Sequence, residues 1–419
     1  MSRPRIIVAV EVEGPAKAWQ RSDGLTRITE FIREGETMVA TRFFANLISG
    51  DSHVMEPYDL WWKALGPKFG DRTPRVLDEY QGRTGAFFYS GNRGAPVAVI
   101  RDLIPTSDAA AKEAEDKGLG EAGYVPEVRM RFQEEAGVKA EVLNPTRMLA
   151  ILRNPDVEVV QACAQVFNDW EAEFVAYDPK RLIGVSVIPM HDVNWAVKEL
   201  ERTLRAGLVG PMINCQAPEG CPPYRDPVYD RFWAVAEEAG APVTLHILTG
   251  RVLSPLTQTD TQTPLERGAN PHRMLELFGE IQAVLANDFI FGGILDRFPQ
   301  LDVVCSEFEL SWIPHFMWRI DELQDPYGFG SRMHLPALKM KASDYMKTRI
   351  YHGLIDDAFG PQMIQLIGAD RVLWGSDFPH IRSIGLGAQE HVHQLFGALP
   401  PQDQERVVGG NAAKVFKIG

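Results

Sequence analysis

The chain has 419 residues, of which 45% are hydrophobic and 24% are charged, and its formal net charge is -13. This composition predicts a soluble globular protein with enough apolar material for one large domain or two average ones. The acidic balance argues against nucleic acid or an anionic membrane as a partner, because phosphate binding requires clustered Lys and Arg. A small-molecule substrate is the partner that this composition still allows.

The cysteines and the amino terminus predict a cytoplasmic protein. Cys163, Cys215, Cys221 and Cys305 are too few and too scattered for a disulfide framework. The short apolar run near the amino terminus is interrupted by glutamates at positions 11 and 13 before it reaches signal-peptide length. Since no stretch approaches roughly 18 uninterrupted apolar residues, we expect no membrane span.

The first part of the chain is irregular. Residues 1–37 lack the rhythm that follows and are predicted to be an N-terminal extension, with residues 38–419 forming one barrel domain. Alternating apolar residues and glycines over 82–101 predict a β-hairpin, and the alanine-rich segment 107–123 predicts a surface helix. We interpret about 63–125 as an insertion after the first barrel strand, of the kind that forms a lid or a subunit contact.

From there on, predicted strands alternate with helical stretches. The eight strands are predicted at Leu47–His53, Val138–Leu143, Arg181–Pro189, Leu208–Asn214, Val243–Ile247, Leu301–Ser306, Arg349–Leu354 and Val372–Gly375. Eight strands alternating with helices is the number that a (β/α)8 barrel requires. No GxGxxG turn follows the first strand, so the pattern does not favour a dinucleotide-binding sheet.

Three of these strands end in side chains that can bind a metal ion. Asp51 and His53 are two residues apart and therefore share one face of the first strand, while His246 ends the fifth strand and Asp377 follows the eighth. Each alone has an ordinary explanation, such as a helix cap or a hydrogen-bonded core histidine. Together at one face of a barrel they predict a catalytic metal site, and mixed imidazole and carboxylate ligands favour Zn, Mn or Fe over Mg or Ca.

Other residues near strand ends are candidates with open roles. Glu307, directly after the sixth strand, is a further ligand, a general base, an orienter of a ligand histidine or a partner of a buried arginine. Glu56 is a ligand or a helix cap. His380 donates to substrate or stabilises the turn at Pro379. Arg251 and Arg382 are candidates for clamping a substrate carboxylate, with a surface role as the alternative.

Several motifs resemble the amidohydrolase superfamily. The segment from Asp51 to Pro57 resembles its opening metal motif, and more closely the amidohydrolase-related branch that contains aminocarboxymuconate semialdehyde decarboxylase and the resorcylate-type decarboxylases. Further blocks of the same kind are Asn168-Asp169-Trp170, Asp178 to Leu182, Gly292 to Pro299, Glu307, Trp312-Ile313-Pro314 and Trp374 to His380. The resemblance extends from about Ala40 to the carboxyl end.

The resemblance implies a distorted (β/α)8 barrel, one divalent metal ion that is usually Zn or Mn, and often a homodimer. It implies Asp51, His53, His246 and Asp377 as the ligands. Two positions depart from the family pattern: Asp51 stands where His or Glu is common, and Glu307 stands where many relatives have a histidine.

Two chemistries fit such a site. The resemblance favours non-oxidative decarboxylation, or related carbon–carbon cleavage, of a small aromatic or muconate-like carboxylic acid, with Asp377 or His380 delivering the proton. The alternative is hydrolysis of an amide, lactone or β-diketone by a metal-bound hydroxide. A third interpretation, a barrel that binds a metabolite without catalysis, predicts little or no metal in the purified protein.

Overall fold

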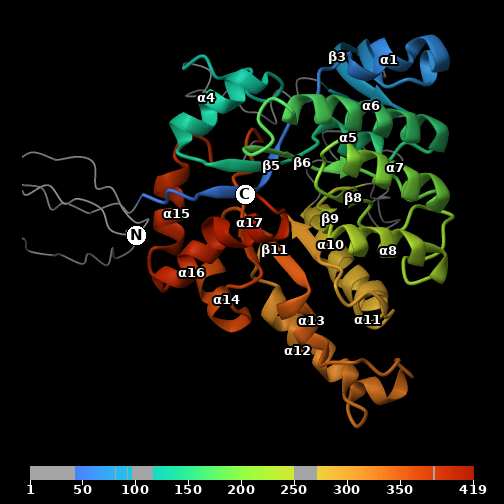
Figure 1. Cartoon of the computed structure of the whole chain (residues 1–419). Helices are drawn as coiled ribbons and strands as arrows, with labels where there is room; N and C mark the ends of the chain where they lie inside the picture. The colour runs from blue at the N-terminus through green and yellow to red at the C-terminus, as the bar shows by residue number, and fades with distance from the viewer. Residues whose placement is uncertain (1–42, 81, 92, 97–116, 250–270, 381–382) are drawn as a thin grey trace, which may run out of the picture.

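The computed structural model describes residues 43–80, 82–91, 93–96, 117–249, 271–380 and 383–419, so the expected extension over 1–37 lies outside the described residues. Short parallel strands form its centre, and helices lie outside them (Figure 1). They pair in the orders β1-β5-β6 and β12-β11-β10-β9-β8-β7. The parallel strands are β1 (Ile48–His53), β5 (Ala140–Asn144), β6 (Leu182–Gly184), β7 (Ser186–Val187), β8 (Pro211–Ile213), β9 (Val243–His246), β10 (Val303–Ser306), β11 (Ile350–Leu354) and β12 (Val372–Trp374).

Backbone hydrogen bonds join the two sets of strands at both ends. β6 and β7 are consecutive pieces of one strand interrupted at Val185, and both bond to the chain entering β8. At the other end, the Asp377 N–H donates to Asp51 O and the His53 N–H donates to Phe378 O, each over 2.8 Å. The predicted distorted (β/α)8 barrel is confirmed, with the irregular pieces at β6/β7 and at the β1/β12 seam.

Helices fill the connections between the strands, and their ends follow ordinary capping rules. The Asp192 side chain caps α7 by accepting hydrogen bonds from the backbone N–H groups of Asn194 and Trp195. Helix α8 is followed by Gly240, which has a left-handed φ of 55°. The remaining bounds are α5 (Arg147–Ile151), α6 (Val157–Val175), α7 (Val193–Arg205), η2 (Pro227–Tyr229), α8 (Asp230–Ala239), α12 (Ile313–Gln324), η4 (Phe329–Arg332), α13 (Ala342–Thr348), α14 (Gly360–Ile367), α15 (Ala388–Phe396), α16 (Pro401–Glu405), η5 (Arg406–Gly410) and α17 (Asn411–Val415).

The segment between β1 and β5 is more structured than the sequence predicts. It contains α1 (Leu60–Phe69), η1 (Gly70–Arg72) and an antiparallel sheet of β2 (Arg75–Tyr80), β3 (Arg83–Ser90) and β4 (Arg93–Pro96). The hairpin predicted within 82–101 is present as β3 and β4, and β2, which has no buried residue and carries little apolar signal, is a further strand that the sequence analysis misses. Residues 97–116, which include most of the predicted surface helix, lie outside the described part of the chain.

Helix α4 (Pro126–Ala136) is absent from the predicted elements, and it leads directly into β5. Its sequence signals are nevertheless present. Pro126 occupies the first helical position, and Gly137 follows the last turn with a left-handed φ of 66°. One face of α4 is buried, including Arg129 and Phe132.

The barrel strands are apolar on both faces, as parallel strands covered by helices should be. Alternate residues of β10 to β12 fall into two apolar clusters: Val304, Tyr351 and Leu373 in one, and Val303, Ile350 and Val372 in the other. Thr244 pairs with Val304 and His246 pairs with Ser306. Because side chains alternate along a strand, His246 therefore lies on the same face as Val304, at the carboxyl end of β9.

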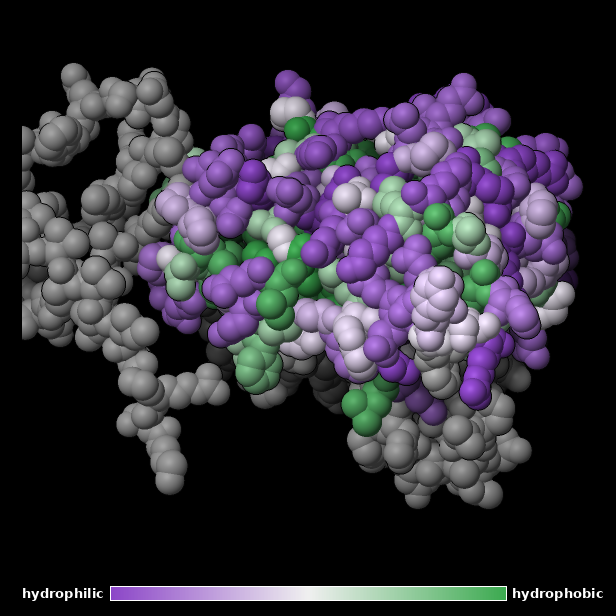
Figure 2. Space-filling model, turned by 90° about the horizontal axis from the view of Figure 1, so that it is seen from below, coloured by the Kyte–Doolittle hydropathy of each residue, from purple (hydrophilic) through white to green (hydrophobic). Residues whose placement is uncertain are grey.

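Among the described residues, one helical stretch, Leu275–Arg297, is long and apolar enough to cross a membrane by length and composition alone. Half of its most apolar part is buried inside the protein. It comprises most of α10 (Pro271–Val284) together with η3 (Leu285–Ile290) and α11 (Ile294–Arg297). Its residues Ile281 and Phe289 are fully buried in the larger apolar cluster, which accounts for its composition. The face of the molecule in Figure 2 is mainly hydrophilic, with apolar residues in small separate patches.

Candidate metal centre

Three of the predicted ligands, Asp51, His53 and His246, lie within 4.8 Å of one another at the carboxyl ends of their strands, and the fourth, Asp377, lies beside His53 in a second group with His380. His53 Nε2 lies 3.2 Å from His246 Nε2, 3.3 Å from Asp377 Oδ1 and 3.7 Å from Asp51 Oδ1, and His246 Nε2 lies 3.6 Å from Asp51 Oδ1. All four side chains are buried, with Asp377 the most exposed of them at 3% of the residue. The predicted gathering of residues from β1, β9 and the chain after β12 is thus present in the structure.

The hydrogen bonds of the two histidines specify where their lone pairs point. His53 Nδ1 lies 2.8 Å from Pro145 O, and His246 Nδ1 lies 2.8 Å from Ile247 O. A carbonyl oxygen only accepts hydrogen bonds, so each Nδ1 carries a hydrogen, and Nε2 presents a lone pair whenever its ring is neutral. Because the two Nε2 atoms are 3.2 Å apart, either a proton on one of them or a metal ion beside both must separate their lone pairs.

The carboxylates of the same cluster also retain unused acceptors. Asp51 Oδ2 and Asp377 Oδ1 are buried and have no hydrogen-bond partner, although buried polar atoms are almost always paired. Two imidazole nitrogens and two carboxylates with free oxygens match the ligand set of a divalent Zn, Mn or Fe ion. The residues present therefore fit the metal ion that the sequence predicts.

The pKa values of the two histidines move in opposite directions. Burial, followed by the nearby rings of His380 and His246, lowers the pKa of His53 well below its ordinary value. Burial also disfavours the charged form of His246, but Asp51 and then Glu307 outweigh it and raise the pKa of His246 to about 9. One neutral and one protonated ring is the arrangement that these carboxylates support without a metal ion.

His380 connects the ligand Asp377 to a partly exposed edge of the site. Its Nδ1 lies 2.8 Å from Asp377 Oδ1, without the alignment of a hydrogen bond, and its side chain is 23% exposed. Its Nε2 lies 2.9 Å from Thr146 Oγ1, whose hydroxyl donates to Val54 O over 2.7 Å. The hydroxyl hydrogen is thereby committed, so Nε2 of His380 is the donor to Thr146.

Glu307 lies beside the centre. Its Oε2 is 3.7 Å from His246 Nε2, and its side chain is 29% exposed. Burial, followed by the negative charge of Asp377, raises the pKa of Glu307 well above its ordinary value. Both Glu307 and Asp377 have left-handed backbone, with φ of 66° and 54°, a conformation that is uncommon outside glycine and concentrates at functional sites.

Glu56 is a helix cap, which decides between its two predicted roles. Its Oε2 accepts from the backbone N–H groups of Thr146 and Arg147 at 3.3 and 2.8 Å, and its Oε1 accepts from that of Met148 at 3.0 Å. Both oxygens are thus occupied at the start of α5. Arg251 and Arg382, the predicted carboxylate clamps, lie outside the described residues.

Asn144 is a residue of the site that the sequence analysis misses. It ends β5, and its Nδ2 donates to Asp51 Oδ1 over 2.8 Å. A polar residue at a strand's carboxyl end is the same signal that identifies His246. Asn144 could therefore have been found by extending the search from metal ligands to amides.

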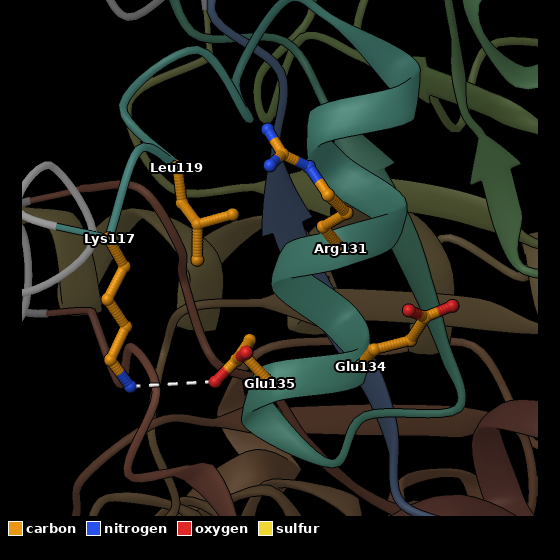
Figure 3. A pocket seen from close by; sticks show the side chains of 5 residues that line it. All are labelled: Lys117, Leu119, Arg131, Glu134 and Glu135. Carbon is orange, nitrogen blue, oxygen red and sulfur yellow. Dashed lines mark ion pairs between the residues drawn. The ribbon is translucent and has the colours of Figure 1, made fainter.

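A surface depression of about 710 Å³ lies elsewhere, against one side of α4 (Figure 3). Lys117, Leu119, Arg131, Glu134 and Glu135 line it, and Lys117 Nζ lies 3.5 Å from a Glu135 carboxylate oxygen. It contains none of the candidate ligands. Its mixed charges offer neither an apolar wall nor a single-sign surface, so it is not the site of the chemistry.

Known proteins with similar sequences are decarboxylases. Gamma-resorcylate decarboxylase of Polaromonas sp. is 27% identical over 307 residues, which are 69% of this chain and 86% of that protein. The 2-amino-3-carboxymuconate-6-semialdehyde decarboxylase of Dictyostelium discoideum is 26% identical over 263 residues, 61% of this chain and 66% of that protein.

Solved structures share the fold. An amidohydrolase of Mycobacterium avium subsp. paratuberculosis superimposes with a TM-score of 0.70 at 20% identity, covering 88% of this chain and 99% of its own. A dihydroxybenzoic acid decarboxylase of Polaromonas sp., solved with manganese and the inhibitor 2-nitroresorcinol, has a TM-score of 0.56 at 23% identity and covers 75% and 94% of the two chains.

The sequence profile of the amidohydrolase family matches residues 58–418, which is most of the chain. The solved structure of the amidohydrolase shares the fold of this chain, and the two proteins similar in sequence are decarboxylases. This chain belongs to the amidohydrolase family and is an enzyme, and the similar sequences described above are those of decarboxylases.

Proposed function

We propose that this enzyme is a metal-dependent, non-oxidative decarboxylase of a small aromatic or muconate-like carboxylic acid. The supporting observation is the pair of Nε2 atoms of His53 and His246 that face each other, flanked by oxygens of Asp51 and Asp377 that have no hydrogen-bond partner. Those four residues would hold one divalent ion, which we propose to be Mn or Zn, since three of the similar solved structures contain manganese. The homodimer and the cytoplasmic location expected from the sequence stay predictions.

A bound metal ion would supply a positive charge that fixes the substrate's carboxylate and adjacent oxygen and stabilises negative charge on the ring or enol as it develops. The residues of the chain then manage the proton. The bond between the substrate carbon and its carboxylate carbon breaks, its electron pair stays on the substrate carbon, and that carbon takes a proton as CO2 leaves. Asp377 is the proton donor in this proposal.

His380, held in position by Thr146, would keep Asp377 supplied with protons. His380 Nδ1 lies against Asp377 Oδ1, while His380 Nε2 is fixed by Thr146. The ring of His380 also lies 3.8 Å from that of His53, tilted by 33°, so its orientation is constrained from two sides. Since His380 is the partly exposed member, it connects the buried acid to solvent.

The test is direct measurement of CO2. The purified full chain, loaded with Mn²⁺ or Zn²⁺, is incubated with 2,6-dihydroxybenzoate, 5-carboxyvanillate and other hydroxybenzoates, and both CO2 and the decarboxylated ring are quantified. We expect release of both in equal amounts from at least one acid, and none after treatment with a chelator.

Two other results would replace the proposal. Hydrolysis of activated esters, amides or lactones without CO2 would assign the enzyme to the hydrolytic chemistry of the family. A purified protein that contains and binds no zinc, manganese or iron would support the interpretation as a barrel that only binds a metabolite.

A further inference from the structure

The ligands of the metal centre are divided across the β1/β12 seam, the line where the first and last strands meet. Asp51 and His53 belong to β1, and Asp377 follows β12. The two sides approach closely at Gly375, where an added Cβ would lie 2.6 Å from the Asp51 Cβ. The distance between the ligands therefore depends on how this seam is held.

Three buried serines occupy the seam. Ser49 Oγ donates to Asp51 O over 2.8 Å and accepts from the Ser376 N–H over 2.8 Å. Ser52 Oγ lies 2.8 Å from both Ser49 Oγ and Ser376 Oγ. These hydroxyls join the two ligand-bearing segments side by side, but they have no charge and no fixed direction of their own.

Arg129 of α4 anchors this group from outside the barrel. Its Nε and Nη2 donate to the two oxygens of Glu141 on β5, over 2.6 and 2.9 Å, and both side chains are fully buried. Its Nη1 donates to His53 O over 2.9 Å, and its Nη2 lies 3.5 Å from Phe378 O. One guanidinium thus contacts the backbone on both sides of the seam.

Glu141 contacts both the Arg129 guanidinium and Ser52, and two aromatic rings pack beside this network. Glu141 Oε1 also accepts from Ser52 Oγ, and Glu141 Oε2 accepts from Gln133 Nε2, each over 2.9 Å. The Phe378 ring stacks on Phe132 of α4 with centroids 3.7 Å apart, and the Arg129 guanidinium lies 5.0 Å from the Phe378 ring.

We propose that Arg129 is a positioning residue for the metal centre: by bridging His53 O, Phe378 O and Glu141, it sets the distance between the ligands of β1 and Asp377. The inference rests on the proposed function, because it assumes that these ligands hold a metal ion. The role requires arginine, since its planar fork has donors in several fixed directions, whereas a lysine offers one charged nitrogen. Residues behind the ligands typically govern metal affinity about 10- to 100-fold.

The experiment measures Mn²⁺ binding to the metal-stripped full chain, by calorimetry or by paramagnetic resonance of free Mn²⁺, for wild type and Arg129→Lys. The matched control is Arg202→Lys, because Arg202 also donates through two nitrogens to a buried glutamate, Glu199, over 2.8 and 2.7 Å, away from the seam. Thermal unfolding in excess chelator reports the loss of stability in each variant without metal.

We expect Arg129→Lys to weaken Mn²⁺ binding by about 10-fold or more, and Arg202→Lys to leave it unchanged within the error of the titration. Wild-type affinity in folded Arg129→Lys would overturn the proposal, as would equal weakening in both variants at equal loss of stability. If Arg129→Lys does not fold, Ser52→Ala decides, because it removes the hydroxyl that joins Glu141 to Ser49 and Ser376. Wild-type affinity in that variant overturns the proposal.

The same titration separates this inference from the proposed function. Absence of Mn²⁺ and Zn²⁺ binding by the wild type would remove the metal-dependent decarboxylase itself. Binding by the wild type with no change in Arg129→Lys or Ser52→Ala would remove only the positioning role.

Discussion

Nε2 of His53 and Nε2 of His246 lie 3.2 Å apart, while the opposite nitrogen of each ring is directed at a backbone carbonyl oxygen. Second interactions of this kind fix the tautomer of metal-binding histidines. The pair is therefore already arranged to bind an ion before one arrives, and four measurements follow from this centre and from the buried groups around it.

Metal binding should stabilise the protein. Because the unfolded chain does not hold these ligands together, an ion at 100 times its dissociation constant adds about 2.7 kcal/mol to the free energy of unfolding. We expect the unfolding temperature to rise with Mn²⁺ in the wild type but not in His246→Ala. A similar rise in the variant would place the stabilising ion elsewhere.

Asp377→Asn should remove turnover and leave the fold intact. Loss of a proton donor typically costs about 10²- to 10⁴-fold in rate, and loss of a ligand carboxylate adds to it. Asparagine tolerates the left-handed backbone at this position, where φ is 54°. The measurement is CO2 release beside circular dichroism; a variant that keeps wild-type turnover would exclude Asp377 as the donor.

His352 should make the protein less stable in acid. It is buried in β11, where burial lowers its pKa from 6.5 to about 4. The unfolded chain then binds more protons between these values, so stability falls as pH drops from 6.5 towards 4, by about 3 kcal/mol in total. Urea unfolding of His352→Gln should show a smaller fall over this range than wild type.

The control for His352 is His315→Gln, at an exposed histidine of α12. It should retain the wild-type dependence of stability on pH. Equal pH dependence in wild type and His352→Gln would assign the acid sensitivity to other groups.

Glu171 should make the protein less stable as the pH rises, which is the opposite of the effect of His352. This carboxyl on α6 is fully buried and neither oxygen has a hydrogen-bond partner, and burial, followed by the charge of Glu56, raises its pKa well above 4.5. A raised pKa means stability that is complete below 4.5 and is lost as pH rises through the folded value. Glu171→Gln should therefore gain stability over wild type between pH 5 and pH 8, measured by urea unfolding, whereas Glu173→Gln, at an exposed position of the same helix, should not.

The sequence was sufficient to predict the barrel and its ligand cluster because both depend on local patterns. Short apolar runs end at Asp51/His53, His246 and near Asp377, and the parallel barrel brings such ends to one face. Domain boundaries, by contrast, stay predictions. The role of Glu56 was undecided because capping depends on where α5 begins, which is set by the docking of Pro145 and Thr146 against β1.

The network behind the ligands could not be predicted for a different reason. Arg129 and Glu141 are 12 residues apart, and each alone is an ordinary charged residue of a helix or a strand. They become a pair only when α4 packs on β5, and their contact with Phe378 O depends on the other end of the chain. Contacts between such distant parts of the chain leave no periodic pattern in the sequence.

The division of the centre between β1 and the chain after β12 also orders events during synthesis. Asp51 and His53 leave the ribosome long before Asp377, so a nascent chain presents only some of the proposed metal ligands. We expect full occupancy to wait until β12 docks beside β1, so that captured metal would mark closure of the ring of strands.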